Sequence, residues 1–293
     1  MKIAMTGSTG LVGSALVPLL EGNGHQVLRM RRPGHWDPEK GTIDKSVLEG
    51  VDAVINLAGE SIAGSRWTAT KKARIRDSRV KGTRLLSESL AKLNRQPQVL
   101  VSSSAIGYYG DRGSEVLREE SPPGKGFLPE VCRQWEAATD PATRAGIRVV
   151  HIRTGLVLSG KGGALRQMLL PFKLGVGGKI GSGRQYWSWI SLDDLCGAFV
   201  HSLQANVHGP VNAVSPTPAT NLEFTKALGH AISRPTIFPM PAFAARIALG
   251  EMADELLLAS ARVEPTKLMA TRFGFRHRDL EPTLRYLLGK NAG

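Results

Sequence analysis

Three glycines with regular spacing are the clearest chemical signal in the sequence. Gly7, Gly10 and Gly13 follow the apolar residues 2–6 and open a stretch with helical periodicity. In this context the first glycine permits a sharp turn, the second lets a pyrophosphate approach the backbone, and the third lets helix and strand pack closely. The N-terminus of the helix offers free amides and a positive dipole end to phosphates. The sequence therefore predicts a dinucleotide site with contacts from Gly7, Thr9, Gly10, Leu11, Val12 and Gly13.

Two arginines stand where the cofactor is selected. NAD-binding chains usually place an acidic residue about 20 residues after the glycines, where it holds the ribose hydroxyls. This chain has Arg31 and Arg32 at the corresponding place, and the first acid is Asp37. Guanidinium groups form strong charge-assisted bonds with a 2′-phosphate, although solvated surface arginines would look the same in sequence. The substitution favours NADP(H) over NAD.

The chain is strongly basic, with a net charge of +13. Residues 66–84 contain eight Lys or Arg residues against one acid, Asp77. Nucleic acid, a phosphate-rich small ligand and a solvated helix face would all explain this stretch. Because no nucleic-acid recognition motif accompanies the charge, we expect a small-molecule partner, anionic or sugar-like, and no nucleic acid.

Strand and helix patterns alternate through the first half of the chain. Helices are predicted over 11–22, over the basic stretch and over 128–145. Short apolar strands separated by helices indicate an α/β fold with a doubly wound parallel sheet. We expect a dinucleotide-binding domain over 1–155, completed by later segments, and a smaller C-terminal α/β lobe over 156–293 that binds substrate. The strands are predicted over 2–6, 25–30, 51–58, 98–103 and 147–152.

The ordered motifs TGSTGLVG, NLAGE, VSSSAIGYYG and WSWISLDDL resemble those of the extended short-chain dehydrogenase/reductases. The segments RIRDSRVKGT, WEAA and GEMADELLLASARVEPTKL are similar to its atypical branch of sugar-nucleotide-epimerase-like proteins, over nearly the whole chain. The resemblance implies a Rossmann-type domain, NADP(H) and a substrate-binding C-terminal lobe. It also implies cofactor contacts outside the glycine loop at Arg31, Arg32, Leu57, Ala58, Arg79 and Val157.

The resemblance also implies a catalytic Tyr-x-x-x-Lys pair, and this chain lacks it in the expected helix before Trp135-Glu136. Ser104 stands where the family places a substrate-orienting hydroxyl, although a serine at a strand end often bonds only to backbone. Tyr109 follows that strand and is the substitute acid/base that we name, with ring packing as its alternative. Tyr108, Cys132 and Glu136 are further candidates, each with an ordinary structural explanation.

Residues 181–190 occupy the place where related enzymes line the substrate cleft. Arg184 could pair with a substrate phosphate, and Trp187 and Trp189 could stack on a ring. A packed connection between lobes would show the same residues.

The sequence thus predicts an NADP(H)-dependent oxidoreductase or epimerase for a polar substrate, a nucleotide sugar among the candidates. The alternative is a non-catalytic NADPH-binding regulator, favoured by the missing Tyr–Lys pair. Cys132 and Cys196 show no metal spacing, and no run approaches the roughly 18 apolar residues of a membrane helix. We expect a cytoplasmic protein without metal or membrane partner, and a homodimer is compatible with the sequence.

Overall fold

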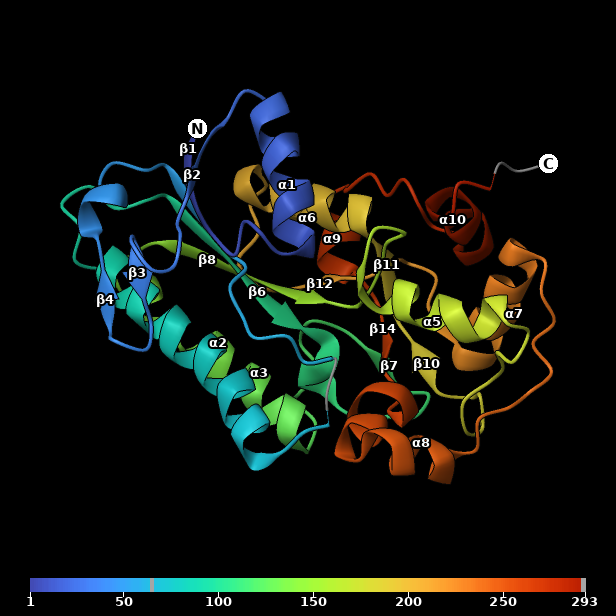
Figure 1. Ribbon diagram of the computed structural model, residues 1–293. Coiled ribbons are helices and arrows are strands. Elements are labelled where there is room, and N and C mark those ends of the chain that lie inside the picture. Colours follow the sequence, from blue (N-terminus) through green and yellow to red (C-terminus); the bar gives the residue numbers. More distant parts are fainter. Residues whose placement is uncertain (64–65, 291–293) are drawn as a thin grey trace.

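The computed structural model describes residues 1–63 and 66–290 and has a six-stranded parallel sheet at its centre (Figure 1). The strand order is β12-β8-β6-β5-β1-β2. After β1 and β2 the chain crosses to the other side of β1, where β5 and the later strands are added. This is the predicted α/β, doubly wound sheet. Its strands are β1 (Lys2–Thr6), β2 (Gln26–Arg29), β5 (Ala53–Asn56), β6 (Val99–Ala105), β8 (Arg148–Thr154) and β12 (Gly209–Ala213).

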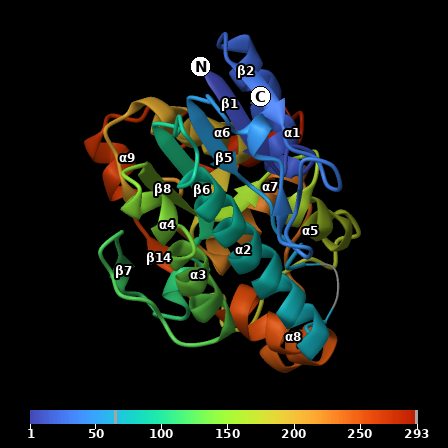
Figure 2. The same ribbon diagram turned by 90° about the vertical axis from the view of Figure 1, so that its left-hand side faces the viewer.

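Helices cover both faces of this sheet, as Figures 1 and 2 show. On one face, Ile3 and Met5 pack with α1 (Leu11–Gly22) and α6 (Leu192–Gln204). On the other face, Ala4 and its neighbours pack with α2 (Ala69–Leu90) and α4 (Asp140–Arg144). Successive residues of β1 point to opposite faces, so an uninterrupted apolar strand is required for two-sided burial.

One predicted helix needs correction, and one hairpin was not predicted. The helix predicted over 128–145 is two helices, α3 (Phe127–Ala137) and α4, separated near Thr139. Pro141 stands at the start of α4, where its fixed φ and missing N–H are tolerated, whereas they would disrupt a continuous helix. The sequence also did not reveal the hairpin of β3 (Trp36–Asp37) and β4 (Thr42–Ile43).

The C-terminal half contributes to two bodies of structure. Its β12 lies at one edge of the central sheet, and its α6 belongs to one of the layers that cover that sheet. A further core around Trp189, Phe224 and Leu284 belongs to a smaller lobe of short helices and two-stranded pairs. The elements of this second half are β9 (Leu156–Leu158), α5 (Gly163–Lys173), β10 (Tyr186–Trp187), β11 (Trp189–Ser191), β13 (Ala219–Thr220), α7 (Asn221–Ile232), α8 (Ala242–Leu249), η3 (Ala253–Leu258), β14 (Arg262–Val263), α9 (Thr266–Ala270) and α10 (Leu280–Leu287); β14 pairs with β7 (Val116–Leu117) from the first half. None of the helices that the structure describes is both long and apolar enough to span a bilayer.

Candidate functional site

The glycine loop has the geometry that a pyrophosphate site needs. Gly7 has φ of +68°, and a Cβ there would lie 2.7 Å from the carbonyl carbon of Leu57. A Cβ on Gly13 would overlap the carbonyl oxygen of Gly7. At Gly10, by contrast, the nearest atom to a Cβ would be 3.5 Å away, and the residue is exposed. Two glycines are therefore required by the fold, whereas the third leaves one side of the loop open to a ligand.

The N-terminus of α1 points its first amides at this open side. The N-cap residue is Gly10, which has no side chain to accept hydrogen bonds from the first turn. Thr9 beside it is exposed, and Leu11 and Val12 are partly buried. Gly163 of the second half packs on Leu11, where a Cβ would lie 3.0 Å from Leu11 Cδ2. The α1 N-terminus, bordered by this later segment, is suited to hold an anion.

Arg31 and Arg32 differ in their surroundings. The guanidinium of Arg32 lies 3.1 Å from Glu39 Oε1 and 3.8 Å from Asp37 Oδ1. Within residues 1–63 and 66–290, Arg31 has no acidic side chain within salt-bridge distance, and it is exposed. Arg31 is therefore the arginine whose charge is available to a phosphate.

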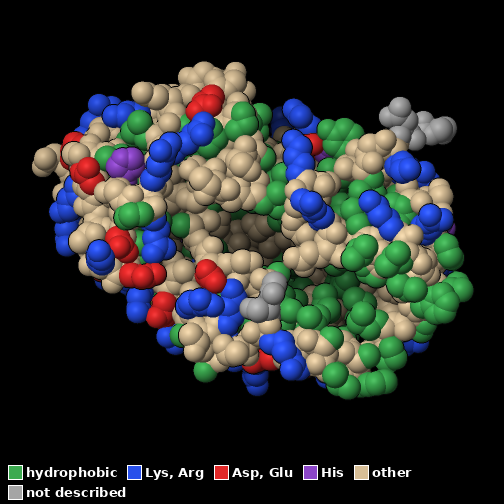
Figure 3. Space-filling model, viewed as in Figure 1, with side chains coloured by type: hydrophobic (Ala, Val, Ile, Leu, Met, Phe, Trp, Pro, Cys, Tyr) green, Lys and Arg blue, Asp and Glu red, His purple; other side chains and the backbone are tan. Residues whose placement is uncertain are grey.

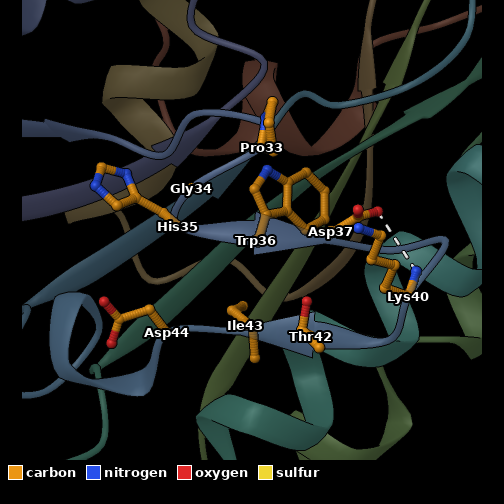
Figure 4. Close-up of a pocket in the computed structure, with 9 residues that line it drawn as sticks. All are labelled: Pro33, Gly34, His35, Trp36, Asp37, Lys40, Thr42, Ile43 and Asp44. Carbon is orange, nitrogen blue, oxygen red and sulfur yellow. Dashed lines mark hydrogen bonds between the residues drawn. The ribbon is translucent and has the colours of Figure 1, made fainter.

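A pocket of about 320 Å³ follows these arginines along the chain (Figure 4). Trp36 stands in its middle, with His35 and Asp44 at one end and Asp37 and Lys40 at the other. The pocket belongs to the β3–β4 hairpin, which Figure 1 shows at the end of the molecule opposite the C-terminal lobe. It contains none of the predicted catalytic residues.

A buried hydrogen-bond network links the carboxyl ends of the central strands. Thr6 Oγ1 donates to Asn56 Oδ1 at 2.7 Å, and Asn56 Nδ2 donates to Thr83 Oγ1 and Ser102 Oγ at 2.9 and 3.2 Å. Trp135 Nε1 donates to the same Thr83 hydroxyl. The network fixes β1, β5 and β6 against α2 and α3. The sequence did not reveal it, because its members come from five separate elements.

The expected contacts that follow β5 lie beside the glycine loop. The carbonyl of Leu57 packs against Gly7, and the Ala58 amide donates to Thr6 Oγ1 at 3.3 Å. Val157 lies in β9, which pairs with β11, and packs against the core on the α1 face.

Arg79 supports the chain just after β5. Its Nη1 donates to the carbonyls of Glu60 and Ile75 at 2.9 and 3.1 Å, and the guanidinium lies 5.1 Å from the ring centre of Trp135. Burial lowers the pKa of Arg79. These two contacts use only Nη1 of the guanidinium group, and its other nitrogens can donate hydrogen bonds to a ligand.

Much of the basic stretch 66–84 is engaged within the protein. Lys71 pairs with Glu60 at 2.7 Å, and Lys72 pairs with Glu251 at 2.8 Å. Asp77 lies 2.8 Å from Arg76 and 2.9 Å from Lys81, and Arg66 donates to the carbonyl of Ile247. Of the eight cations in this stretch, four therefore pair with acids, and Arg66 and Arg79 bind backbone carbonyls.

Ser104 is the last residue but one of β6, and a buried ion pair holds its side chain. Its hydroxyl donates to Glu136 Oε1 at 2.7 Å. Arg153 of β8 binds both oxygens of the same carboxylate, through Nε and Nη2, at 2.8 Å each. Burial opposes ionisation of Glu136, but the hydrogen bonds and charge of Arg153 outweigh it, so the pKa of Glu136 lies below its ordinary value. Glu136 is therefore an ionised acceptor at neutral pH and a weak base.

Tyr109 is fully buried. Its hydroxyl accepts from Arg153 Nη1 at 3.0 Å and lies 2.7 Å from Asn212 Oδ1 and 3.0 Å from the carbonyl of Arg118. Burial raises the pKa of Tyr109 to about 12. In this conformation the hydroxyl faces protein partners on every side, which is the environment of a structural tyrosine.

Other candidates from the sequence are also enclosed. Cys132 is buried, and burial raises the pKa of its thiol to about 12, so the thiol stays protonated at neutral pH. Arg153 lies 3.5 Å above the ring centre of Tyr108. Trp187 and Trp189 are buried and donate to the carbonyls of Leu257 and Thr217, respectively. Both rings are therefore packed inside the protein and do not form an exposed surface on which a substrate ring could stack.

The N-terminus of α3 is capped from the C-terminal lobe. The amides of Phe127 and Leu128 donate to the two carboxylate oxygens of Glu255 at 3.1 and 3.3 Å. This contact fixes the helix that carries Glu136. Neither Glu255 nor Arg153 was identified from the sequence. A signal for Arg153 was present, because a charged residue that continues the apolar strand 147–152 needs a partner where it is buried.

Comparison with known proteins agrees with this arrangement. Residues 3–214 match the NAD dependent epimerase/dehydratase family, and residues 240–287 match a domain of unknown function, DUF1731. "Epimerase family protein Mb2239" of Mycobacterium bovis is 45% identical over 97% of this chain and 96% of its own length. "Epimerase family protein SDR39U1" of Homo sapiens is 36% identical over 98% of this chain and 100% of its own.

Solved structures are similar over the whole chain. The crystal structure of human epimerase family protein SDR39U1 (isoform2) with NADPH has a TM-score of 0.90 at 34% identity and covers 99% of each chain. That of the nucleoside-diphosphate sugar epimerase from Corynebacterium glutamicum has a TM-score of 0.81 at 39% identity, covering 99% of this chain and 58% of that one. The fold, the glycine loop and these similarities together show that the chain belongs to the NAD-dependent epimerase/dehydratase family.

Proposed function

We propose that this protein binds NADP(H) and acts as an oxidoreductase or epimerase on a polar small molecule, a nucleotide sugar among the candidates. The observation that carries the proposal is the open glycine loop at the α1 N-terminus, with the exposed Arg31 following β2. The similarity to a human structure solved with NADPH supports the same cofactor. We place the protein in the cytoplasm, and a homodimer stays a prediction.

The residues present fit the cofactor. A Cβ at Gly10 would meet only open space within 3.5 Å, so a pyrophosphate can approach the backbone there. Amides of the α1 first turn would hold the phosphates, and Arg31 would hold the 2′-phosphate. Leu57, Ala58, Arg79 and Val157 are the further contacts that we propose. When bound, the cofactor supplies or accepts a hydride at its nicotinamide ring.

The chain itself contributes a hydroxyl and a carboxylate to proton movement. Ser104 Oγ donates to Glu136, which leaves its oxygen lone pairs able to accept a hydrogen bond from a substrate hydroxyl. Glu136 would hold the Ser104 proton in place but, with its lowered pKa, takes it up poorly. We therefore assign substrate orientation to Ser104 and expect slow proton transfer.

A second candidate function rests on the same site. A non-catalytic NADPH-binding regulator is favoured because the groups near Ser104 are poorly suited to acid/base work: Glu136 is a weak base, Cys132 stays protonated and Tyr109 is enclosed. For that function only cofactor binding and a partner that responds to it would be required.

Calorimetry and stopped-flow absorbance distinguish these candidates. We expect firm NADPH binding, followed by slow loss of NADPH absorbance with at least one member of a panel of carbonyl compounds and sugar nucleotides. No turnover with any compound, together with a protein retained only in the presence of NADPH, would support the regulator. Absence of NADPH binding would contradict both proposals.

A further inference from the structure

An exposed apolar surface lies on the C-terminal lobe, away from the glycine loop. Monomeric proteins seldom expose large contiguous apolar patches without a partner. Figure 3 shows hydrophobic side chains gathered over the region of α5, α7 and α8. We call this set the C-lobe surface; its exposed members are Leu170, Leu174, Val176, Leu222, Ile237, Phe238, Met240, Phe243 and Ile247.

Two helices each expose a pair of these side chains one helical turn apart. Leu170 and Leu174 stand four residues apart at the end of α5, and they are 65% and 69% exposed. Phe243 and Ile247 stand four apart on α8 and are 65% and 70% exposed. Ala245, between them in sequence, is fully buried. Each helix therefore packs one face on the lobe and leaves an apolar face outward.

Backbone hydrogen bonds join the two segments into one surface. The Met240 amide donates to the carbonyl of Lys179, and the Gly181 amide donates to the carbonyl of Met240, both at 2.8 Å. The backbone of Gly178 lies against the carbonyl of Phe238. The segment after α5 and the segment before α8 are thus held side by side. This pairing places Phe238 and Met240 next to the segment that follows α5.

Apart from the exposed Glu223, which follows Leu222, the charged side chains of these segments are cations. Residues 166–184 and 226–250 contain no Asp or Glu, whereas the adjoining Glu251 pairs with Lys72. Only Arg246 among their cations is within salt-bridge distance of an acid in the described chain, at 2.8 Å from Asp254. In the view of Figure 3, Lys and Arg side chains border the apolar area. The cations are Arg166, Lys173, Lys179, Arg184, Lys226, Arg234 and Arg246.

We propose that the C-lobe surface docks the protein onto an anionic phospholipid bilayer. An apolar face edged by Lys and Arg enters the headgroup region with its apolar side chains, while its cations bind lipid phosphates. A second copy of the chain fits less well, because a two-fold interface would bring together two surfaces bordered mainly by cations. Docking of this kind requires no membrane-spanning helix. The sequence predicted no membrane partner, because no run in it approaches the roughly 18 apolar residues of a membrane helix.

Vesicle co-sedimentation tests the proposal. The protein is mixed with vesicles of phosphatidylcholine alone, or of phosphatidylcholine and phosphatidylglycerol in equal parts. We expect at least about tenfold tighter binding to the anionic vesicles, weakened by salt. The double variant Phe243→Glu/Ile247→Glu should lose at least about tenfold, because both side chains would enter the lipid.

The single variant Phe243→Glu is also compared with a matched control, Met269→Glu, which places the same single charge at a residue that is 58% exposed in α9, outside the C-lobe surface. This control should bind vesicles like the unaltered protein. Circular dichroism confirms that each variant is folded. Equal sedimentation of the double variant and the unaltered protein, or no binding to anionic vesicles, overturns the proposal. A dimer in gel filtration that the double variant dissociates, without vesicle binding, would assign the surface to a second copy.

Discussion

The hydroxyl of Ser104 lies 2.7 Å from the carboxylate of Glu136, which reaches the end of β6 from α3. Arg153 completes the arrangement from β8, with its side chain 3% exposed. Family resemblance leads one to expect a tyrosine and a lysine on that helix. In this chain the charged group beside the serine is instead a carboxylate held ionised by an arginine.

The two arginines after β2 should contribute unequally to cofactor affinity. We expect NADPH to bind at least about tenfold more tightly than NADH, a difference of about 1.4 kcal/mol. Arg31→Ala should weaken NADPH by about 1–3 kcal/mol, because the 2′-phosphate loses a charge-assisted bond. Arg32→Ala, the matched control, should cost less, since Arg32 is already paired with Glu39. Isothermal titration calorimetry measures all three. Equal affinity for the two cofactors would contradict the NADP(H) assignment.

Removing the charge of Glu136 should destabilise the fold. In Glu136→Gln the buried Arg153 loses its counter-charge, which we expect to cost about 3 kcal/mol of unfolding free energy. Glu130→Gln is the matched control on the same helix, because Glu130 forms an exposed pair with Arg133 and should cost under about 1 kcal/mol. Urea denaturation compares the two, and equal losses would show that the ion pair contributes little.

The contribution of Glu136 should depend on pH. Its pKa is lower in the folded protein than in the unfolded chain, where a glutamate titrates near pH 4.3. The stabilisation is therefore complete above that pH and is lost as pH falls through the folded pKa. The unfolding free energies of the unaltered protein and Glu136→Gln should converge in acid. A gap that stays constant from pH 7 down to the acid limit of folding would argue against an ionised Glu136.

Any turnover should depend on Ser104 more than on Cys132. Ser104→Ala removes the hydroxyl that we assign to substrate orientation, and a misplaced substrate can lower the rate by about 10²-fold. Cys132→Ala removes a protonated, buried thiol and should leave the rate within a few-fold, provided the fold is intact. Stopped-flow absorbance with the most active compound gives both rates. A larger loss in Cys132→Ala would reassign the acid/base role.

Tyr109→Phe should report on structure rather than on chemistry. The variant keeps the ring and removes an oxygen that has Arg153 and Asn212 as buried partners. We expect a loss of about 1–3 kcal/mol in unfolding free energy, because those partners are left unsatisfied, and unchanged NADPH affinity. Thermal unfolding and calorimetry provide the two measurements. A selective loss of turnover without loss of stability would restore Tyr109 as a catalytic residue.

Local signals in the sequence determined the nucleotide-binding half. The glycine loop and strands such as 2–6 could be predicted, because turn, strand and helix preferences act between residues a few positions apart. The order of motifs along the chain likewise indicated the family. The residues after β2 predicted the cofactor preference, but the structure distinguishes Arg31 from Arg32 through acids that the hairpin brings back.

Only the tertiary structure decided the partners of buried polar groups. Ser104 and Glu136 are 32 residues apart, and Glu255 caps α3 from 128 residues away. Which side chains meet depends on strand order and helix register, which no short window contains. The same holds for exposure: Phe243 and Ile247 have the spacing of a core-facing helix, yet they point outward because α8 buries its Ala245 side against the lobe. Burial is a property of the assembled layers, and periodicity alone does not specify which face of a helix is covered.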